Sequence, residues 1–281
     1  MTAWTGVVLA PRAPGEDEML SRISTYLHPI AGRPLVWHTL ASLATATPAP
    51  ERLVLLGTPD LDTALIPALP LPLDSAPLAG DGVAAALSTA DVPAGSLLLA
   101  EAAAPLIAPE VQHLLARSEP TLVAAPGGAP LLLWLPAADP ADLGDAASLA
   151  ELAATVPGLT RLKADPGSAL LVRDRTTLAI AVAGVRDRLV RRLMDAGVTV
   201  LLPETVLLDV DVRVGRDSVL YPGVMLEGQT TVGEETVIGP GCRIIDSWIG
   251  SGVEMKGWNF IAQTSVRNRA ILEPYVRRGF D

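Results

Sequence analysis

The sequence predicts an α/β fold in two parts: a three-layer Rossmann-like domain, residues 1–196, and a short left-handed parallel β-helix, residues 197–281. Two patterns carry this prediction. Short apolar strand candidates alternate with helical segments in the first part. Apolar residues recur every six positions in the second part. A chain of 281 residues is long enough for two domains with cores of their own.

The first part opens as strand, loop and helix. A buried strand is expected at residues 6–10, and a loop rich in Pro, Gly and acidic residues follows it to Glu18. A helix is expected at residues 34–43, with Pro34 in its first turn, where a missing N–H is tolerated. The same alternation continues with strands at 52–57 and 96–100 and a helix at 109–117. Such alternation is typical of a parallel sheet covered by helices.

The end of the first part is a connecting helix at residues 176–196. Its apolar residues fall at helical spacing, and Gly197 suits the C-terminal cap. Between the helix expected at 109–117 and this connecting helix, residues 124–148 are rich in Ala, Pro, Gly and Asp and predict one strand only, Leu131–Leu135. The layout of residues 120–170 stays open at this point.

The second part carries a hexad repeat with one face of a triangular coil per hexad. The apolar residue of each hexad is expected to point inward, together with the residue four positions later. Five-residue steps at two points shorten the repeat. Three hexads make a coil, so about four coils are expected. The apolar positions are Leu208, Val214, Leu220, Leu226, Val232, Ile238, Ile244, Ile249, Met255, Ile261, Val266 and Leu272.

Composition excludes several classes of protein. The net charge of −10 argues against a general nucleic-acid role. No run of about 18 apolar residues marks a membrane span, and the N-terminus lacks the basic start of a signal peptide, so we expect a cytoplasmic protein. The single cysteine, Cys242, excludes an intrachain disulfide and a multi-cysteine metal site.

Four segments resemble the bifunctional N-acetylglucosamine-1-phosphate uridyltransferase / glucosamine-1-phosphate acetyltransferase family. They are Leu-His-Pro-Ile-Ala-Gly-Arg-Pro-Leu-Val-Trp-His at 27–38, Pro-Leu-Ile-Ala-Pro-Glu at 105–110, the stretch 173–199 containing Leu-Met-Asp-Ala-Gly-Val-Thr, and the repeat around 238–250. The resemblance extends over nearly the whole chain and is most specific in the C-terminal third. It implies a nucleotidyltransferase-like domain and a homotrimer packed through the β-helix, with Trp248, Trp258 and Phe260 as candidate interface or core residues.

The uridyltransferase positions that the resemblance implies are altered here. The family's glycine-rich phosphate loop is replaced by Pro11-Arg-Ala-Pro-Gly-Glu-Asp-Glu18, which has fewer amide donors and three added carboxylates. Thr25 stands at the position of the lysine in the family's Pro-Lys-x-Leu-His-Pro segment. Ala103 and Arg173 stand at the positions of the two protein ligands of Mg²⁺. Glu101 lies two residues before Ala103 on the same strand face and is a candidate substitute ligand.

Two further assignments stay open. Gly80 and Asp81 fall where the family reads uracil, or they form an ordinary Gly-rich turn. The acetyltransferase reaction that the resemblance implies needs a histidine base, but His28, His38 and His113 all lie outside the repeat. We therefore expect no acetyltransferase site.

Three hypotheses follow. The first is a non-catalytic relative with a binding, regulatory or scaffold role, no metal and no cofactor. A nucleotide or sugar phosphate is its possible ligand, with Arg12, Gly80, Asp81, Glu101 and Arg173 as possible contacts. The second is an active sugar-1-phosphate nucleotidyltransferase with Mg²⁺ and a rebuilt site, using Arg12, Glu16, Asp17 and Glu101. The third and weakest is a hexapeptide-repeat acyltransferase.

Overall fold

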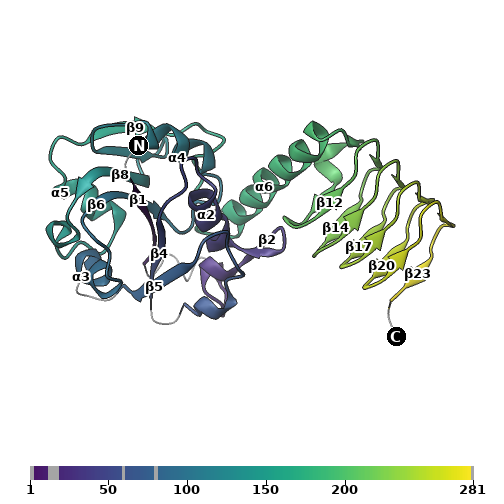
Figure 1. Cartoon of the computed structure of the whole chain (residues 1–281), viewed down its shortest axis with the longest axis horizontal. Helices are drawn as coiled ribbons and strands as arrows, with labels where there is room; N and C mark the ends of the chain where they lie inside the picture. The colour runs from purple at the N-terminus through teal and green to yellow at the C-terminus, as the bar shows by residue number, and fades with distance from the viewer. Residues whose placement is uncertain (1–2, 12–18, 59–60, 79–81, 280–281) are drawn as a thin grey trace. The chain divides into compact units, whose positions relative to one another are not determined.

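The computed structural model describes residues 3–11, 19–58, 61–78 and 82–279. Contacts between residues divide the chain into two units. Unit 1 comprises residues 1–29 and 34–181, and unit 2 comprises residues 30–33 and 182–281. Figure 1 shows a sheet flanked by helices in unit 1 and a stack of coils in unit 2. Helix α6, Arg175–Asp195, contains the division between Ala181 and Val182, whereas the sequence places the domain boundary after residue 196.

Unit 1 is built on a sheet of seven strands in the order β5-β4-β1-β6-β8-β7-β9. Strands β5, β4, β1 and β6 are parallel neighbours, and β8 runs antiparallel to both β6 and β7. The strands are β1 Trp4–Ala10, β4 Arg52–Gly57, β5 Leu73–Pro77, β6 Gly95–Glu101, β7 Thr121–Ala124, β8 Pro130–Ala138 and β9 Thr160–Lys163.

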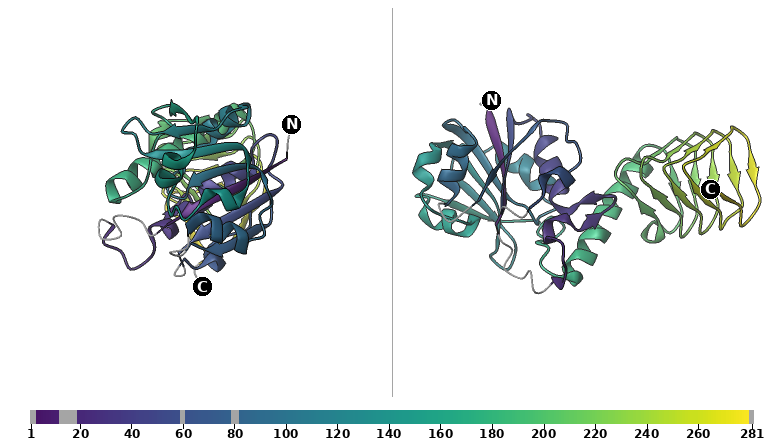
Figure 2. Two further views of the ribbon diagram at one scale, coloured as in Figure 1. Left: turned by 90° about the vertical axis from the view of Figure 1, so that its left-hand side faces the viewer. Right: turned by 90° about the horizontal axis from the view of Figure 1, so that it is seen from below.

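Helices cover both faces of this sheet, which confirms the three-layer prediction (Figures 1 and 2). One core cluster joins the sheet to α2, Leu35–Ala44, and α4, Ala108–Leu115. The other joins the opposite face to α3, Gly82–Thr89, and α5, Leu149–Thr155. The alternation follows from the strand period of two, since Val8 lies in the first cluster and Val7 and Leu9 lie in the second.

The expected elements of unit 1 are present, with shifts at their ends. The strand expected at 6–10 begins at Trp4, and Pro34 is the N-cap of α2 rather than a residue of its first turn. Helices α3 and α5 and strands β5, β7 and β9 are not among the elements that the sequence predicts. The remaining short elements are β2 Pro29–Ile30, β3 Arg33–Pro34, η1 Thr25–Leu27, η2 Thr63–Leu65 and η3 Pro140–Leu143.

Helix α6 ends as the sequence predicts. Gly197 has a φ of +91°, the left-handed conformation that a glycine adopts without strain. Its N–H donates to the carbonyl oxygen of Met194 (3.0 Å), and the N–H of Val198 donates to that of Leu193 (3.0 Å). This pair of bonds is the Schellman motif, which satisfies carbonyls left free at the helix end.

Unit 2 is a parallel β-helix, as predicted. Its short strands stack into three sheets of five, five and four strands within the described residues 199–278 (Figure 2). The strands are β10 Thr199–Val200, β11 Leu207–Leu208, β12 Arg213–Val214, β13 Val219–Leu220, β14 Met225–Glu227, β15 Thr231–Val232, β16 Val237–Ile238, β17 Arg243–Ile245, β18 Trp248–Ile249, β19 Glu254–Met255, β20 Phe260–Ala262, β21 Ser265–Val266, β22 Ile271–Leu272 and β23 Arg277–Arg278; η4 is Pro203–Thr205.

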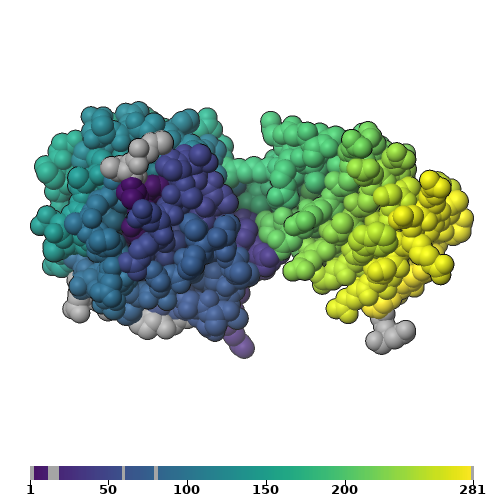
Figure 3. All heavy atoms as spheres, in the orientation of Figure 1, coloured from purple at the N-terminus to yellow at the C-terminus, as the bar shows by residue number. Residues whose placement is uncertain are grey.

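The repeat sets the register of the coils. Leu207 pairs with Met225 and Met225 pairs with Arg243, both 18 residues apart. After the five-residue step the spacing is 17 residues, as between Arg243 and Phe260. In Figure 3 the surface of unit 2 passes from green at its first coils to yellow at its last coils.

The inward positions are filled as the hexad predicts. Eleven of the twelve apolar positions are buried, and Val214 is half-buried. The residues four positions later include Ser218 and Thr236, which are fully buried, and their hydroxyls bond to the backbone of the next coil. Ser218 Oγ donates to the carbonyl of Gly233 (2.9 Å), and Thr236 Oγ1 donates to that of Gly250 (2.9 Å). Buried hydroxyls are stable only when paired in this way.

Surface aromatics settle one alternative that the sequence left open. The side chains of Trp248 and Trp258 are 47% and 58% exposed, so neither belongs to the core. Phe260 is half-buried, with the guanidinium groups of Arg243 and Arg277 at 5.4 and 5.8 Å from its ring centre. Within the described residues, no helix has both the length and the apolar character that a membrane span requires.

Candidate functional site

A pocket of about 240 Å³ lies in unit 1 at the carboxyl ends of β1 and β6. In parallel α/β sheets, ligands bind outside the carboxyl ends of the strands. Among the described residues, the pocket wall is mostly apolar, with one carboxyl group and one guanidinium group. The lining residues are Pro11, Tyr26, Glu101, Ala103, Pro130, Ser148, Ala150, Leu171, Val172 and Arg173.

Backbone hydrogen bonds hold the pocket floor together. The N–H of Ala102 donates to the carbonyl oxygen of Leu9 (2.8 Å), which extends the pairing of β1 and β6 past the end of β6. The N–H of Val172 donates to the carbonyl oxygen of Ala103 (2.9 Å). The second bond places Arg173 beside the end of β6, although 70 residues of sequence separate it from Ala103.

The start of helix α6 fixes the backbone of Arg173. Asp174 caps the helix, and its carboxylate accepts a hydrogen bond from the N–H of Thr177 (2.6 Å). In return, Thr177 Oγ1 accepts from the N–H groups of Arg173 (2.9 Å) and Asp174 (3.0 Å). The hydrogen bonds from the backbone and side chain of Thr177 lower the pKa of Asp174. This exchange is the capping arrangement that ends a loop and starts a helix.

Two polar side chains complete the wall. Tyr26 is buried, and its hydroxyl donates to the carbonyl oxygen of Pro11 (2.7 Å). Ser148 is the N-cap of α5, where its Oγ accepts from the N–H of Glu151 (3.2 Å) while Glu151 accepts from the N–H of Ala147 (2.8 Å). Both side chains therefore serve the local backbone and hold the wall in place.

Glu101 is the titratable group of the pocket with a strongly perturbed pKa. Burial raises its pKa to about 7, and the charge of Arg173 offsets part of that rise. Removing a carboxylate from water disfavours its charged form, and a nearby cation favours it. At neutral pH the pocket therefore holds a carboxyl group close to half-protonation beside a permanent cation.

The described residues of the pocket do not fit a magnesium ion. Mg²⁺ requires oxygen ligands in near-octahedral geometry. The pocket offers the carboxyl of Glu101, which is already hard to ionise, and Arg173 is a cation. Among the described residues, no group of three or more Asp, Glu, His or Cys side chains is placed to hold a metal ion.

The structure brings three of the sequence-predicted site residues together, namely Glu101, Ala103 and Arg173. Thr25 is buried in η1 and does not line the pocket, and its neighbour Tyr26 does. Arg12, Glu16, Asp17, Gly80 and Asp81 lie outside the described residues.

Sequence reasoning missed the part of the wall formed by Pro130, Ser148 and Ala150. They belong to the stretch around 124–148 whose layout the composition left open. A signal for Ser148 was available, because Ser148-Leu-Ala-Glu151 has the spacing of a capping box and marks the start of α5.

Comparison with known proteins confirms the resemblance over part of the chain. No protein-family model matches. The bifunctional protein GlmU of Geobacillus sp. (strain WCH70) is 44% identical over 85 residues, 30% of this chain and 18% of the relative. That of Carboxydothermus hydrogenoformans is 41% identical over 110 residues, 38% of this chain and 24% of the relative. The matched segments thus cover less than a quarter of these curated relatives.

A solved structure shares the fold. The crystal structure of a Mycobacterium tuberculosis Rv0371c homologue, from Mycobacterium sp. strain JC1, matches 65% of this chain and 96% of its own, with a TM-score of 0.50 and 21% sequence identity. At that identity the match supports the fold class and no more.

Proposed function

We propose, from the likeness of this chain to bifunctional GlmU proteins, that it is a sugar-nucleotidyltransferase-like protein that does not catalyse uridylyl transfer. Its pocket binds a phosphate-bearing ligand, a nucleotide or sugar phosphate, without a metal. One observation carries the proposal: Arg173 lines the same pocket as Ala103 and Glu101. By resemblance, Ala103 and Arg173 stand at the two metal-ligand positions, so a fixed cation occupies the place of a metal site.

The chemistry of the family explains why this exchange removes activity. Phosphoryl-type transfer depends mainly on cations aimed at the phosphates. Loss of one preorganised electrostatic contributor typically costs a hundredfold or more in rate. Here Thr25 replaces the lysine, and Ala103 and Arg173 replace the metal ligands. These losses are not additive, but together they place turnover below detection.

Binding of a phosphate group needs fewer charged side chains than catalysis of its transfer does. A guanidinium group forms charge-assisted, often bidentate hydrogen bonds with phosphate oxygens. Two hydrogen bonds fix the backbone from which that group extends: the N–H of Val172 donates to the carbonyl oxygen of Ala103, and the N–H of Arg173 donates to Thr177 Oγ1. The apolar wall strengthens an electrostatic contact by excluding water.

The test is a thermal-shift measurement with UTP and N-acetylglucosamine-1-phosphate in excess EDTA. Ligand at 100 times its dissociation constant adds about 2.7 kcal/mol to the unfolding free energy. We expect a shift in EDTA that Arg173→Ala abolishes. Arg117→Ala, which removes an exposed arginine of the same unit outside the pocket, is the matched control and retains the shift. Absence of a shift with every ligand overturns the binding proposal.

The second hypothesis, an active enzyme with a rebuilt site, is separated by a pyrophosphate-release assay. The assay contains UTP, N-acetylglucosamine-1-phosphate and Mg²⁺, and is repeated with other nucleotides and sugar phosphates. We expect no turnover above background. Turnover that Arg173→Ala abolishes would show that Arg173 supplies the charge that the metal supplies elsewhere, and the non-catalytic proposal would then be wrong.

A further inference from the structure

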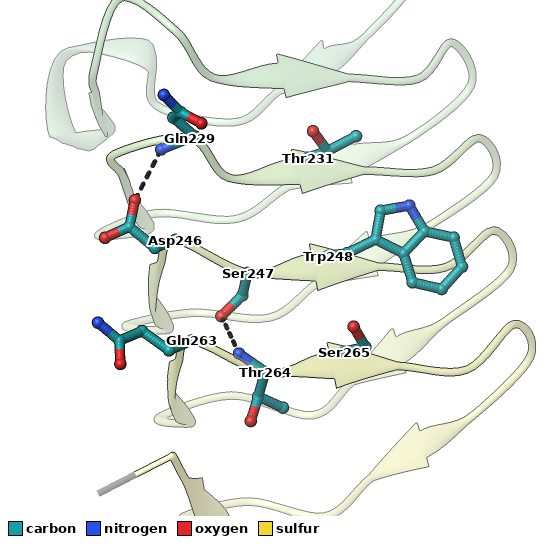
Figure 4. A pocket seen from close by; sticks show the side chains of 8 residues that line it. All are labelled: Gln229, Thr231, Asp246, Ser247, Trp248, Gln263, Thr264 and Ser265. Atoms are coloured by element: carbon teal, nitrogen blue, oxygen red, sulfur yellow. Dashed lines mark hydrogen bonds between the residues drawn. The ribbon is translucent and has the colours of Figure 1, made fainter.

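A groove of about 580 Å³ lies on unit 2, far along the β-helix and independent of the pocket in unit 1. Three successive coils build it (Figure 4). Residues of β15, β18 and β21 form one column, Thr231, Trp248 and Ser265, and the corner before these strands forms a second column, Gln229, Asp246 and Gln263. The groove therefore pairs one large aromatic ring with a set of small polar groups.

The ring of Trp248 is presented to solvent by its neighbours. In the parallel register Trp248 lies between Thr231 and Ser265, whose side chains are much smaller than the indole. The side chain is 47% exposed. Phe260 in the adjacent sheet shows the opposite case, because arginine side chains cover its ring.

The polar groups of the groove are held by the backbone but keep free hydrogen-bonding capacity. Asp246 Oδ1 accepts from the N–H of Gln229 (2.9 Å), and Ser247 Oγ accepts from the N–H of Thr264 (3.1 Å). Within the described residues, the side-chain amides of Gln229 and Gln263 make no hydrogen bond to the protein. These amides offer donors and acceptors in a row along the stack.

The charge of the lining restricts the class of ligand. In the part of the chain that the structure describes, the groove has no lysine, arginine or histidine in its lining, and Asp246 is its single charged residue. A phosphorylated ligand would meet a carboxylate without a compensating cation. A lipid chain would meet mostly hydroxyl and amide groups, which lose hydrogen bonds to water when covered.

A neutral pyranose satisfies both restrictions. One face of such a ring carries C–H groups that pack on an aromatic face, and its hydroxyl groups bond to amides and carboxylates around the rim. Neighbouring coils lie about 4.8 Å apart, so the polar column repeats along the stack and can follow a chain of sugars. We propose that this groove binds neutral oligosaccharides, with Trp248 stacking on a pyranose ring.

The test is isothermal titration of the full chain with maltohexaose, cellohexaose and chitohexaose. We expect saturable binding of at least one of them. Trp248→Thr, which places in β18 the residue that β15 has at the same register, weakens that binding at least tenfold while preserving the fold. Gln263→Ala weakens it several-fold. Tyr221→Ala is the matched control and leaves the affinity unchanged, because it removes an exposed aromatic ring of unit 2 that lies outside the groove.

Three results would overturn the proposal: no binding of any of the three sugars, binding that Trp248→Thr leaves intact, or binding that Tyr221→Ala removes. Circular dichroism and melting curves of each variant separate loss of the site from loss of the fold. Arg173→Ala distinguishes sugar binding in the pocket of unit 1 from sugar binding in the groove of unit 2. Sugar binding that depends on Arg173 and not on Trp248 belongs to the pocket of unit 1 and contradicts the groove, whereas failure of phosphate binding in unit 1 leaves the groove unaffected.

Discussion

The N–H of Val172 donates a hydrogen bond of 2.9 Å to the carbonyl oxygen of Ala103. This single bond joins the segment before helix α6 to the end of β6, and it places Arg173 in the pocket that Glu101 lines. The cation and the carboxyl are thereby held in one apolar pocket. The pKa of Glu101 depends on that arrangement, because burial raises it and the charge of Arg173 lowers it.

Glu101 makes the stability of unit 1 depend on pH. Its pKa rises from 4.5 in the unfolded chain to about 7 in the fold. Between these values the folded state binds more protons than the unfolded state, so stability from this group falls as pH rises from 4.5 to 7 and is level above 7. A shift of this size corresponds to about 3 kcal/mol.

The measurement is urea unfolding of the wild type and Glu101→Gln at pH 5 and pH 8. The other carboxyl groups titrate in both proteins, so their contributions cancel when the stability changes of the two proteins are subtracted. The wild type should lose more stability than the variant between the two values. Equal losses would show that Glu101 titrates near its ordinary value.

Glycine at the corners of the β-helix allows the coils to stack closely. A Cβ atom at Gly233 would lie 2.5 Å from the backbone nitrogen of Ser251 in the next coil, which cannot move without disturbing the stack. Gly233→Ala should therefore lower the unfolding free energy by about 1–3 kcal/mol, as overpacking does. Gly127→Ala is the control, since nothing lies within 4 Å of its Cβ position. Denaturant unfolding that shows equal effects would contradict the close stacking.

We expect no acetyl transfer to glucosamine-1-phosphate by this chain. The reaction of the family uses a histidine base, and the three histidines, His28, His38 and His113, lie outside the repeat. The measurement is release of free CoA thiol from acetyl-CoA. Release above background that depends on the amino sugar would contradict the expectation.

The resemblance also predicts a homotrimer built on the β-helix. The exposed Trp258 and the half-buried Phe260 are candidate anchors, because aromatic residues are favoured at interfaces. Light scattering at tens of micromolar should give three times the 29.2 kDa of one chain. A monomer mass at that concentration would count decisively against the trimer.

The sequence predicts the β-helix better than the pocket, for a physical reason. Each hexad requires an apolar residue at its inward position, so the six-residue spacing alone predicts that Ile238 and Ile244 are buried, as they are. The pocket depends on single contacts between distant segments, such as Tyr26 with Pro11, which leave no periodic trace. The stretch around Pro130 is rich in Ala, Pro and Gly, which carry little periodicity.

The length of the β-helix can change only by whole coils, because its strands stack in register. In-register stacking of residues 17 or 18 apart means that adding or deleting one whole coil keeps every other inward residue inward. A change of two or three residues would rotate all later side chains away from the core. The corner at Asp246, one residue shorter than the corner before it, shows how small a departure the stack accommodates. Related β-helices should accordingly differ in length by whole coils of about 4.8 Å each, so that unit 2 lengthens or shortens only in fixed increments.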